Sequence, residues 1–183
     1  MSSGSPRERI LTVLLVIVAG LLLLDAAPPS AVSSAGSGVS SSDMRARVSA
    51  TLADTNPLLV PRERARIASA VVRYSGQYEL DPELVTAILL VESSARPWAR
   101  SPKGAIGLMQ VMPHMMQPFE LAGNAATIES NIEAGCRILS DNIRRLGVER
   151  GVSAYFWGSD IRGVAYLEKV QERLAAIRGE RPS

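Results

Sequence analysis

The sequence contains few of the side chains that carry out redox, metal or nucleophilic chemistry. Among its 183 residues there is one cysteine, Cys136, and one histidine, His114. A single cysteine excludes an intrachain disulfide, so the fold must be held by core packing. Cys136 falls in an apolar helical pattern, which predicts a buried core residue and not a reactive thiol. We expect His114 at the surface, and we expect neither a metal nor any other cofactor.

Lysine and aromatic residues are also scarce, and the charge is nearly balanced. The lysines are Lys103 and Lys169, aromatic residues make up 4%, and the formal net charge is +2. The arginines are scattered and are not interleaved with aromatic rings, which argues against a nucleic-acid-binding surface. A mildly basic protein remains suited to an anionic polymer such as a cell wall.

One long apolar run is present, from Ile10 to Leu24, and two arginines precede it. Its length lies between that of a signal-peptide core and that of a short membrane span. We therefore predict an exported protein, located in the periplasm or the cell envelope. Residues 1–27 would act either as a signal peptide or as a signal anchor, with residues 10–27 in the inner membrane.

The rest of the chain divides into a linker and one domain. Residues 28–42 are rich in serine, glycine and proline, which predicts a flexible linker. From residue 43 to residue 183, apolar residues recur at helical spacing and no convincing period of two appears. We therefore predict an all-α fold with a single helical domain. The expected helices cover residues 62–78, a segment starting at Asp81-Pro82, a segment starting after Thr127, and residues 161–177.

Glu92 is the candidate catalytic residue. It continues the apolar stripe of Val85, Ile88 and Leu89 on the helix that starts after Asp81. Apolar surroundings and the negative end of the helix dipole both disfavour the charged carboxylate. Glu92 is therefore suited to act as a general acid, which must be protonated before it reacts.

A turn with two glycines, Gly104 and Gly107, follows Glu92, and the segment Leu108-Met109-Gln110 comes next. Glycine permits backbone conformations that other residues avoid, and it lets the backbone approach a ligand closely. We expect a new helix to start at Leu108.

Together these segments resemble the signature of the soluble lytic transglycosylase (SLT) family, the goose-type-lysozyme-like enzymes that cut bacterial peptidoglycan. The resemblance covers roughly residues 74–170. The matching positions are Glu92, Ser93, Pro97, Ala99 and Ser101, the run Gly107-Leu108-Met109-Gln110-Val111-Met112-Pro113, the segment Asn131-Ile132-Glu133-Ala134-Gly135, and Ala154-Tyr155 with Gly158.

The resemblance implies a lysozyme-like domain with a substrate groove between helices and with Glu92 as the single acid and base. Ser101, Gly107 and Gln110 would hold the sugar, and Met109 would supply an apolar floor. The substrate would be a peptidoglycan glycan strand, cut between N-acetylmuramic acid and N-acetylglucosamine to leave 1,6-anhydromuramic ends, without a cofactor.

The fourth motif departs in part from the family pattern. Tyr155 matches, and its hydroxyl would orient and polarise Glu92. Phe156 stands where relatives carry an amide that binds substrate, and Trp157 replaces a small residue. Ala95 stands where many relatives have an aromatic ring, with Trp98 nearby as a substitute. We expect Phe156 to contact the sugar or to reshape one subsite.

Two other functions remain open from the sequence. One is a muramidase, in which water replaces the muramic 6-hydroxyl as the attacking group. The other is a peptidoglycan-binding or assembly module that has lost turnover, which the altered motif at Phe156 and Trp157 favours. Partners would be glycan strands, the membrane through the N-terminal segment, and cell-wall or secretion machinery.

Overall fold

The computed structural model describes residues 39–116 and 127–180, and this part of the chain is helical, as the sequence predicts. The predicted signal segment and most of the linker lie outside the described residues. Within the described ranges, no helix is long and apolar enough to cross a membrane. The helices are α2 (Ser41–Thr55), α3 (Pro61–Gln77), α4 (Pro82–Ser93), the short 3-10 helix η1 (Pro113–Met115), α5 (Ile128–Leu146), α6 (Val148–Trp157) and α7 (Ala165–Arg178).

Side chains at the helix starts explain where the helices begin. The Asp81 carboxylate accepts a hydrogen bond from Glu83 N at 2.8 Å, and Thr127 Oγ1 accepts one from Ser130 N at 3.3 Å. Both predicted starts are confirmed. Helix α2 begins two residues before the predicted domain boundary, because Ser40 Oγ accepts a hydrogen bond from Asp43 N. The predicted start of the last helix at residue 161 is wrong, since α7 begins at Ala165.

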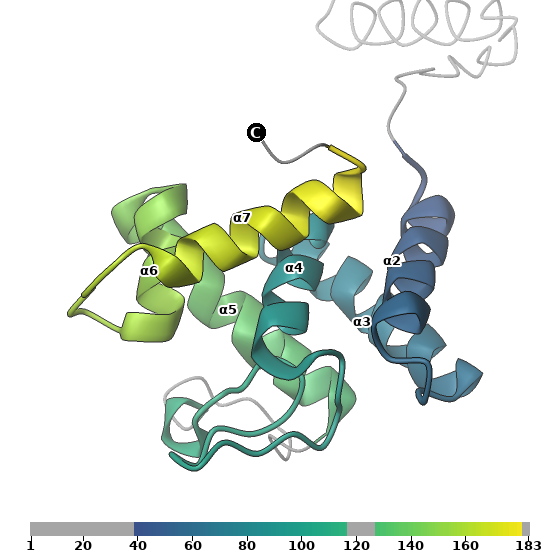
Figure 1. Ribbon diagram of the computed structural model, residues 1–183, viewed down its shortest axis with the longest axis horizontal. Helices are drawn as coiled ribbons and strands as arrows, with labels where there is room; N and C mark the ends of the chain where they lie inside the picture. Colours follow the sequence, from purple (N-terminus) through teal and green to yellow (C-terminus); the bar gives the residue numbers. More distant parts are fainter. Residues whose placement is uncertain (1–38, 117–126, 181–183) are drawn as a thin grey trace, which may run out of the picture. The chain divides into compact units, whose positions relative to one another are not determined.

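Helix α4 lies in the middle of the helical body, and almost every residue from Leu84 to Leu90 is buried (Figure 1). Helix α7 crosses α4, α5 packs against α6, and α2 packs against α3. The α5–α6 contact is close: a Cβ at Gly151 would lie 2.6 Å from the Ile143 Cα. Cys136 is fully buried and His114 is exposed, as predicted.

A cluster of ion pairs connects three helices around the start of α4. Arg178, the last residue of α7, donates to Asp81 and Glu83, and Arg47 of α2 pairs with Glu83. Arg178 and Asp81 are partly exposed, so each pair contributes modestly to stability. The cluster nevertheless fixes the start of the helix whose other end carries Glu92.

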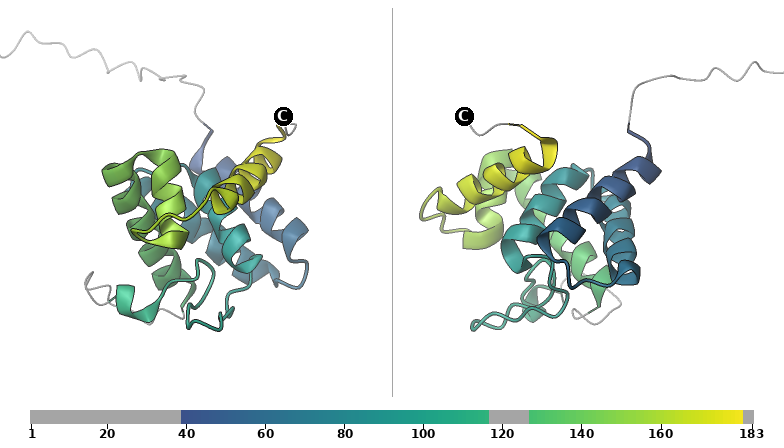
Figure 2. Two further views of the ribbon diagram at one scale, coloured as in Figure 1. Left: turned by 60° about the vertical axis from the view of Figure 1, so that its left-hand side comes forward. Right: turned by 45° about the vertical axis from the view of Figure 1, so that its right-hand side comes forward.

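The segment between α4 and η1 projects from one end of the helical body (Figure 2). The helix expected at Leu108 is absent from it, because Gly107 and Gln110 both have positive φ angles, +78° and +47°. Residues 107–110 form a turn instead, closed by two backbone hydrogen bonds between Ile106 and Val111. This turn places the glycine motif beside the end of α4.

Candidate active site

Glu92 lies half-buried in the last turn of α4. Burial raises the pKa of its carboxyl, because a charged carboxylate loses hydration there. The hydroxyl of Tyr166, from the first turn of α7, donates a hydrogen bond to Glu92 Oε1 at 2.6 Å and opposes that rise. The net shift of the Glu92 pKa is upward, the direction that its apolar surroundings predict. Tyr166 was missed by the sequence reasoning.

The hydroxyl of Tyr155, which was expected to orient and polarise Glu92, donates its hydrogen bond to the Met109 carbonyl at 2.8 Å. Burial, followed by the nearby Glu92 charge, raises the pKa of the Tyr155 hydroxyl well above its ordinary value. Tyr155 thus lies close to the acid but supports the turn that carries Met109.

The side chain of Gln110 spans the turn that it belongs to. Its Nε2 donates to the Gly107 carbonyl at 3.0 Å and to the Ala99 carbonyl at 3.2 Å. The Ala99 carbonyl also accepts from Gly107 N at 2.8 Å. Gln110 therefore has its amide fixed by the protein, with its nitrogen directed at backbone carbonyls.

Ser101 closes the smaller turn at the tip of the same segment. Its backbone N–H donates to the Ala105 carbonyl at 2.9 Å, and its hydroxyl oxygen accepts from Ala105 N at 3.0 Å. The hydroxyl is half-exposed. Ser101, Gly107 and Gln110 are thus brought together in one rigid loop, as the motif implies.

Asn131 of α5 holds this loop against the helices. Its amide donates to the Ile106 carbonyl at 2.9 Å and accepts from Met109 N at 2.8 Å. Gly107 is required at this contact, because a Cβ there would lie 2.5 Å from Asn131 Cγ. The buried Asn131 therefore acts as a structural hydrogen-bonding residue.

The expected apolar floor at Met109 is not found. Met109 is fully buried, and a Cβ at Gly135 would lie 2.5 Å from its sulfur. Its side chain fills the space that Gly135 leaves between the loop and α5. Met109 therefore offers no side-chain surface to a ligand in this structure and contributes to the site through its carbonyl.

Phe156 forms an aromatic cluster beside the acid. Its ring stacks on Tyr166, with centroids 4.8 Å apart and planes inclined by 15°, and it meets Trp157 edge-on at 5.0 Å. Phe156 is 55% exposed, whereas Tyr166 is buried. The solvent-facing ring of Phe156 thus covers the tyrosine that binds Glu92.

Ala95 and Trp98, the residue expected to substitute for the missing aromatic ring, differ in burial. Ala95 is fully buried in the turn after α4, where its φ angle is +57°, while Trp98 is 66% exposed. The Ala95 carbonyl accepts a hydrogen bond from Asn56 Nδ2 at 3.0 Å, which connects this turn to the end of α2. The two positions therefore have different surroundings.

Residues 69–173, more than half of the chain, match the family model described as "Transglycosylase SLT domain". The chain belongs to this family. The transglycosylase of Enterobacteria phage PRD1 is 39% identical over 87 residues, which cover 47% of this chain and 32% of the phage protein. The membrane-bound lytic murein transglycosylase C of Histophilus somni (strain 2336) is 37% identical over 73 residues, covering 34% and 20%. The chain thus spans a third or less of these curated relatives.

A solved structure similar to this SLT domain is the soluble lytic transglycosylase SLT70 of Escherichia coli. The two chains are 21% identical, with a TM-score of 0.47, over 75% of this chain and 28% of the other.

A hollow of about 450 Å³ lies beside the loop of residues 94–112, called the catalytic loop for its proposed role, and two of the predicted site residues line it. Gln110 lines it from the loop, and Tyr155 lines it from α6. Glu92 does not line this hollow, but its charge contributes to the raised pKa of Tyr155, which does. The described residues therefore form a site from α4, the loop, α6 and α7.

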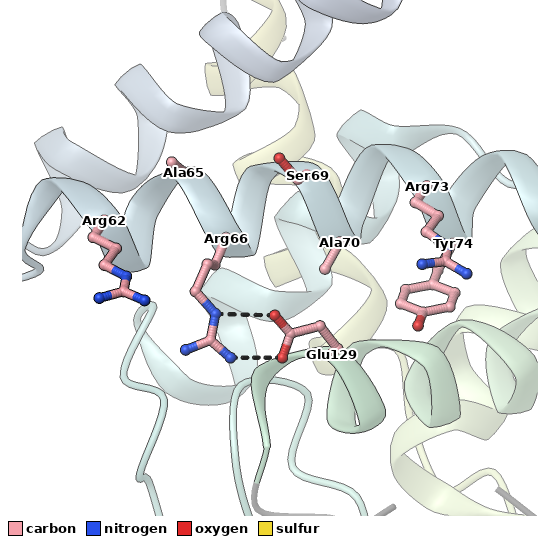
Figure 3. Close-up of a pocket in the computed structure, with 8 residues that line it drawn as sticks. All are labelled: Arg62, Ala65, Arg66, Ser69, Ala70, Arg73, Tyr74 and Glu129. Carbon is pink, nitrogen blue, oxygen red and sulfur yellow. Dashed lines mark hydrogen bonds and ion pairs between the residues drawn. The ribbon is translucent and has the colours of Figure 1, made fainter. Parts of the chain in front are cut away.

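A second hollow of the SLT domain, about 430 Å³ in volume, runs between α3 and α5 (Figure 3). Arg62, Arg66 and Arg73 lie along it on α3. Arg66 makes two parallel hydrogen bonds with the Glu129 carboxylate, at 2.8 and 3.0 Å. This ion pair lowers the pKa of Glu129, which keeps it ionised and unsuited to donate a proton. The hollow is therefore not a second acid site.

Among the described residues of the SLT domain, no group of three or more His, Cys, Asp or Glu side chains is arranged to hold a metal ion.

Proposed function

We propose that this SLT domain is a peptidoglycan lytic transglycosylase in which Glu92 is the single acid and base. The observation that carries the proposal is the setting of Glu92, whose pKa is raised by burial and whose carboxylate oxygen is held by Tyr166. Family membership and the names of the relatives support the activity. The substrate class follows from the same names, which include lytic murein transglycosylase.

The mechanism uses one carboxyl group twice. Protonated Glu92 donates its proton to the oxygen between C1 of N-acetylmuramic acid and N-acetylglucosamine, and the C1–O bond breaks. The muramic N-acetyl oxygen stabilises the electron-poor C1, as in substrate-assisted glycosidases. The Glu92 carboxylate then takes the proton of the muramic 6-hydroxyl, whose oxygen bonds to C1. The product is a 1,6-anhydro end, and Glu92 is protonated again without consumption of water.

Other residues hold the reacting groups in place. The catalytic loop, fixed by Gln110 and Asn131, would present backbone groups and Ser101 to the sugar. Phe156 would contact a sugar face, because it is the exposed ring of the cluster next to the acid. Holding the 6-hydroxyl near C1 is an orientation effect that can lower the barrier by several kcal/mol.

Digestion of purified peptidoglycan, followed by mass spectrometry of the released muropeptides, tests the proposal. We expect anhydro products, which are lighter by one water than hydrolysed ones. Products with reducing ends would assign the domain as a muramidase instead. If the chain sediments with peptidoglycan but releases nothing, the domain is a binding module.

Tyr166 provides a test of how the acid is tuned. We expect Tyr166→Phe to lower the rate of cleavage roughly tenfold, because a hydrogen bond to a charged group is lost. Tyr166 lowers the Glu92 pKa, so its removal leaves burial unopposed and raises that pKa further. The fall in kcat/KM with rising pH, which reports loss of the acid proton, should therefore move to higher pH.

The matched control is Tyr155→Phe, which removes a hydroxyl that donates to the Met109 carbonyl and not to Glu92. This variant should also be slower, but its pH profile should keep its position. The same pH profile in Tyr166→Phe and the unmodified chain would contradict the assignment of Glu92 as the titrating acid.

We also propose that the protein is exported to the cell envelope, with the apolar run Ile10–Leu24 acting as signal peptide or inner-membrane anchor. The names of relatives that are membrane-bound murein transglycosylases support an envelope location. Partners in the cell wall or in a secretion apparatus would follow from this location. Separation of cells into membrane and soluble fractions distinguishes an anchored chain from a released one.

A further inference from the structure

Trp98 is a large apolar side chain left at the surface beside the catalytic loop. It is 66% exposed, and its neighbour Leu58 is 91% exposed. One hollow of about 520 Å³ lies between these two side chains and Arg96, Arg100, Asn56 and Glu63. A second of about 210 Å³ lies between Trp98, Ile106 and Gly107. An exposed ring that lines two hollows is typical of a binding surface.

The backbone that carries Trp98 is held in place. Ala99 N donates to the Arg96 carbonyl at 3.2 Å, and Arg96 Nε donates to the Ser93 carbonyl at 2.9 Å. The Ala99 carbonyl accepts from Gly107 N and from Gln110 Nε2. A ring on a rigid support loses little conformational entropy on binding, so its contact area contributes efficiently to affinity.

The chemistry of the two hollows matches a sugar polymer that carries carboxylates. The flat faces of N-acetylhexosamines are apolar and stack on an indole ring, whereas their edges carry hydroxyl and amide groups. The exposed Arg96 and Arg100 would bind the carboxylates of muramic acid or of its peptide. The alternative ligand for these hollows, to be tested alongside, is a protein partner that packs against Trp98 and Leu58.

The position of the surface also favours a glycan strand. The smaller hollow includes Ala99 and Gly107, the two residues whose carbonyls hold Gln110 in the catalytic loop. Trp98 follows Glu92 by one short turn of chain. We therefore expect a polymer that is bound near Glu92 and is longer than a few sugars to reach this ring.

We propose that Trp98 and its two hollows form an accessory binding site for a peptidoglycan glycan strand, outside the residues that surround Glu92. The substrate class rests on the proposed function. The site would retain long strands and would make little difference to short ones, because only long strands span both regions.

The chain contains two tryptophans, so Trp98 can be observed directly. In a Glu92→Gln, Trp157→Phe chain, which carries Trp98 as its single tryptophan, we would add peptide-free glycan strands and record the emission. We expect a saturable shift of the emission to shorter wavelength. In the Glu92→Gln chain, Trp98→Ala should weaken strand binding roughly tenfold, while Trp98→Phe should retain most of it. Val148→Ala, another exposed apolar position, should have no effect.

An unchanged Trp98 emission while strands bind, or equal binding by Trp98→Ala and its parent, would overturn the proposal. Equal glycan binding would leave a protein partner as the occupant. If the Trp157→Phe chain does not fold, sedimentation of Glu92→Gln with and without Trp98→Ala decides the question alone. The digestion of peptidoglycan by the unmodified chain is a separate result, so a failed catalytic assignment and a failed Trp98 site can be told apart.

Discussion

Glu92→Gln is expected to reduce peptidoglycan cleavage by roughly a thousandfold or more, since a positioned general acid contributes about 10² to 10⁴ in rate and this one serves two steps. The amide cannot donate the proton that the leaving oxygen needs, nor accept one from the 6-hydroxyl. Binding should persist, because the Tyr166 hydroxyl can donate to the Gln oxygen as it does to Glu92 Oε1. The measurement is the rate of release of anhydro-muropeptides, with sedimentation as the test of binding.

The same variant has an expected effect on stability. Burial raises the folded-state pKa of Glu92 above its value in the unfolded chain. The stability associated with the protonated Glu92 carboxyl is therefore fully present below the Glu92 pKa of the unfolded chain. It is lost as pH rises through the Glu92 pKa of the folded chain. As pH increases through that interval, the melting temperature of Glu92→Gln should rise relative to the melting temperature of the unmodified chain.

Peptidoglycan cleavage by Glu92→Gln at a rate near that of the unmodified chain would show that another group is the acid.

Gly107→Ala is expected to lower the free energy of unfolding by about 2–4 kcal/mol, through strain and a steric clash together. The φ angle of +78° disfavours alanine, and its Cβ would lie 2.5 Å from the Asn131 Cγ. To make room, Asn131 would have to release the Ile106 carbonyl and Met109 N, which it now holds. The catalytic loop would then lose its attachment to α5, and activity would fall as well.

Gly104→Ala is the matched control. Gly104 also has a positive φ angle, +92°, but a Cβ there would meet no atom within 4 Å. Its cost should be about 1 kcal/mol, the backbone contribution alone. Urea unfolding of both variants measures the difference. Equal losses would mean that the contact with Asn131 is unimportant and that backbone conformation accounts for the requirement for glycine.

Local signals in the sequence were sufficient to locate the starts of α4 and α5 and to predict that Glu92 is withdrawn from solvent. Asp81 and Thr127 are recognisable caps because the groups that they bind lie two or three residues away. The apolar stripe that ends at Glu92 predicts its burial for the same reason. The SLT motif adds the loop residues, whose hydrogen bonds are mostly made within the loop itself.

Contacts between residues that are far apart in the sequence could not be predicted from these local signals. Tyr166 binds Glu92 across 74 residues, and no periodicity indicates which of two neighbouring tyrosines reaches the acid. The motif favoured Tyr155, whose hydroxyl is directed to Met109. The apolar run after Gly107 looked like a helix start, but the positive φ angle of Gln110 is set by its bonds to Ala99 and Gly107.

The hydrogen bond from Asn56 to the Ala95 carbonyl bears on where this domain can be cut. The family model begins at residue 69 and ends at residue 173, so it leaves out α2 and the Arg178 ion pairs. A fragment trimmed to those limits would keep every motif residue. It would lose the hydrogen bond from Asn56 that holds the turn after Glu92. We therefore expect the smallest stable domain to run from Ser40 through Arg178. The motif-bearing residues then depend on α2, a helix that contains no motif residue.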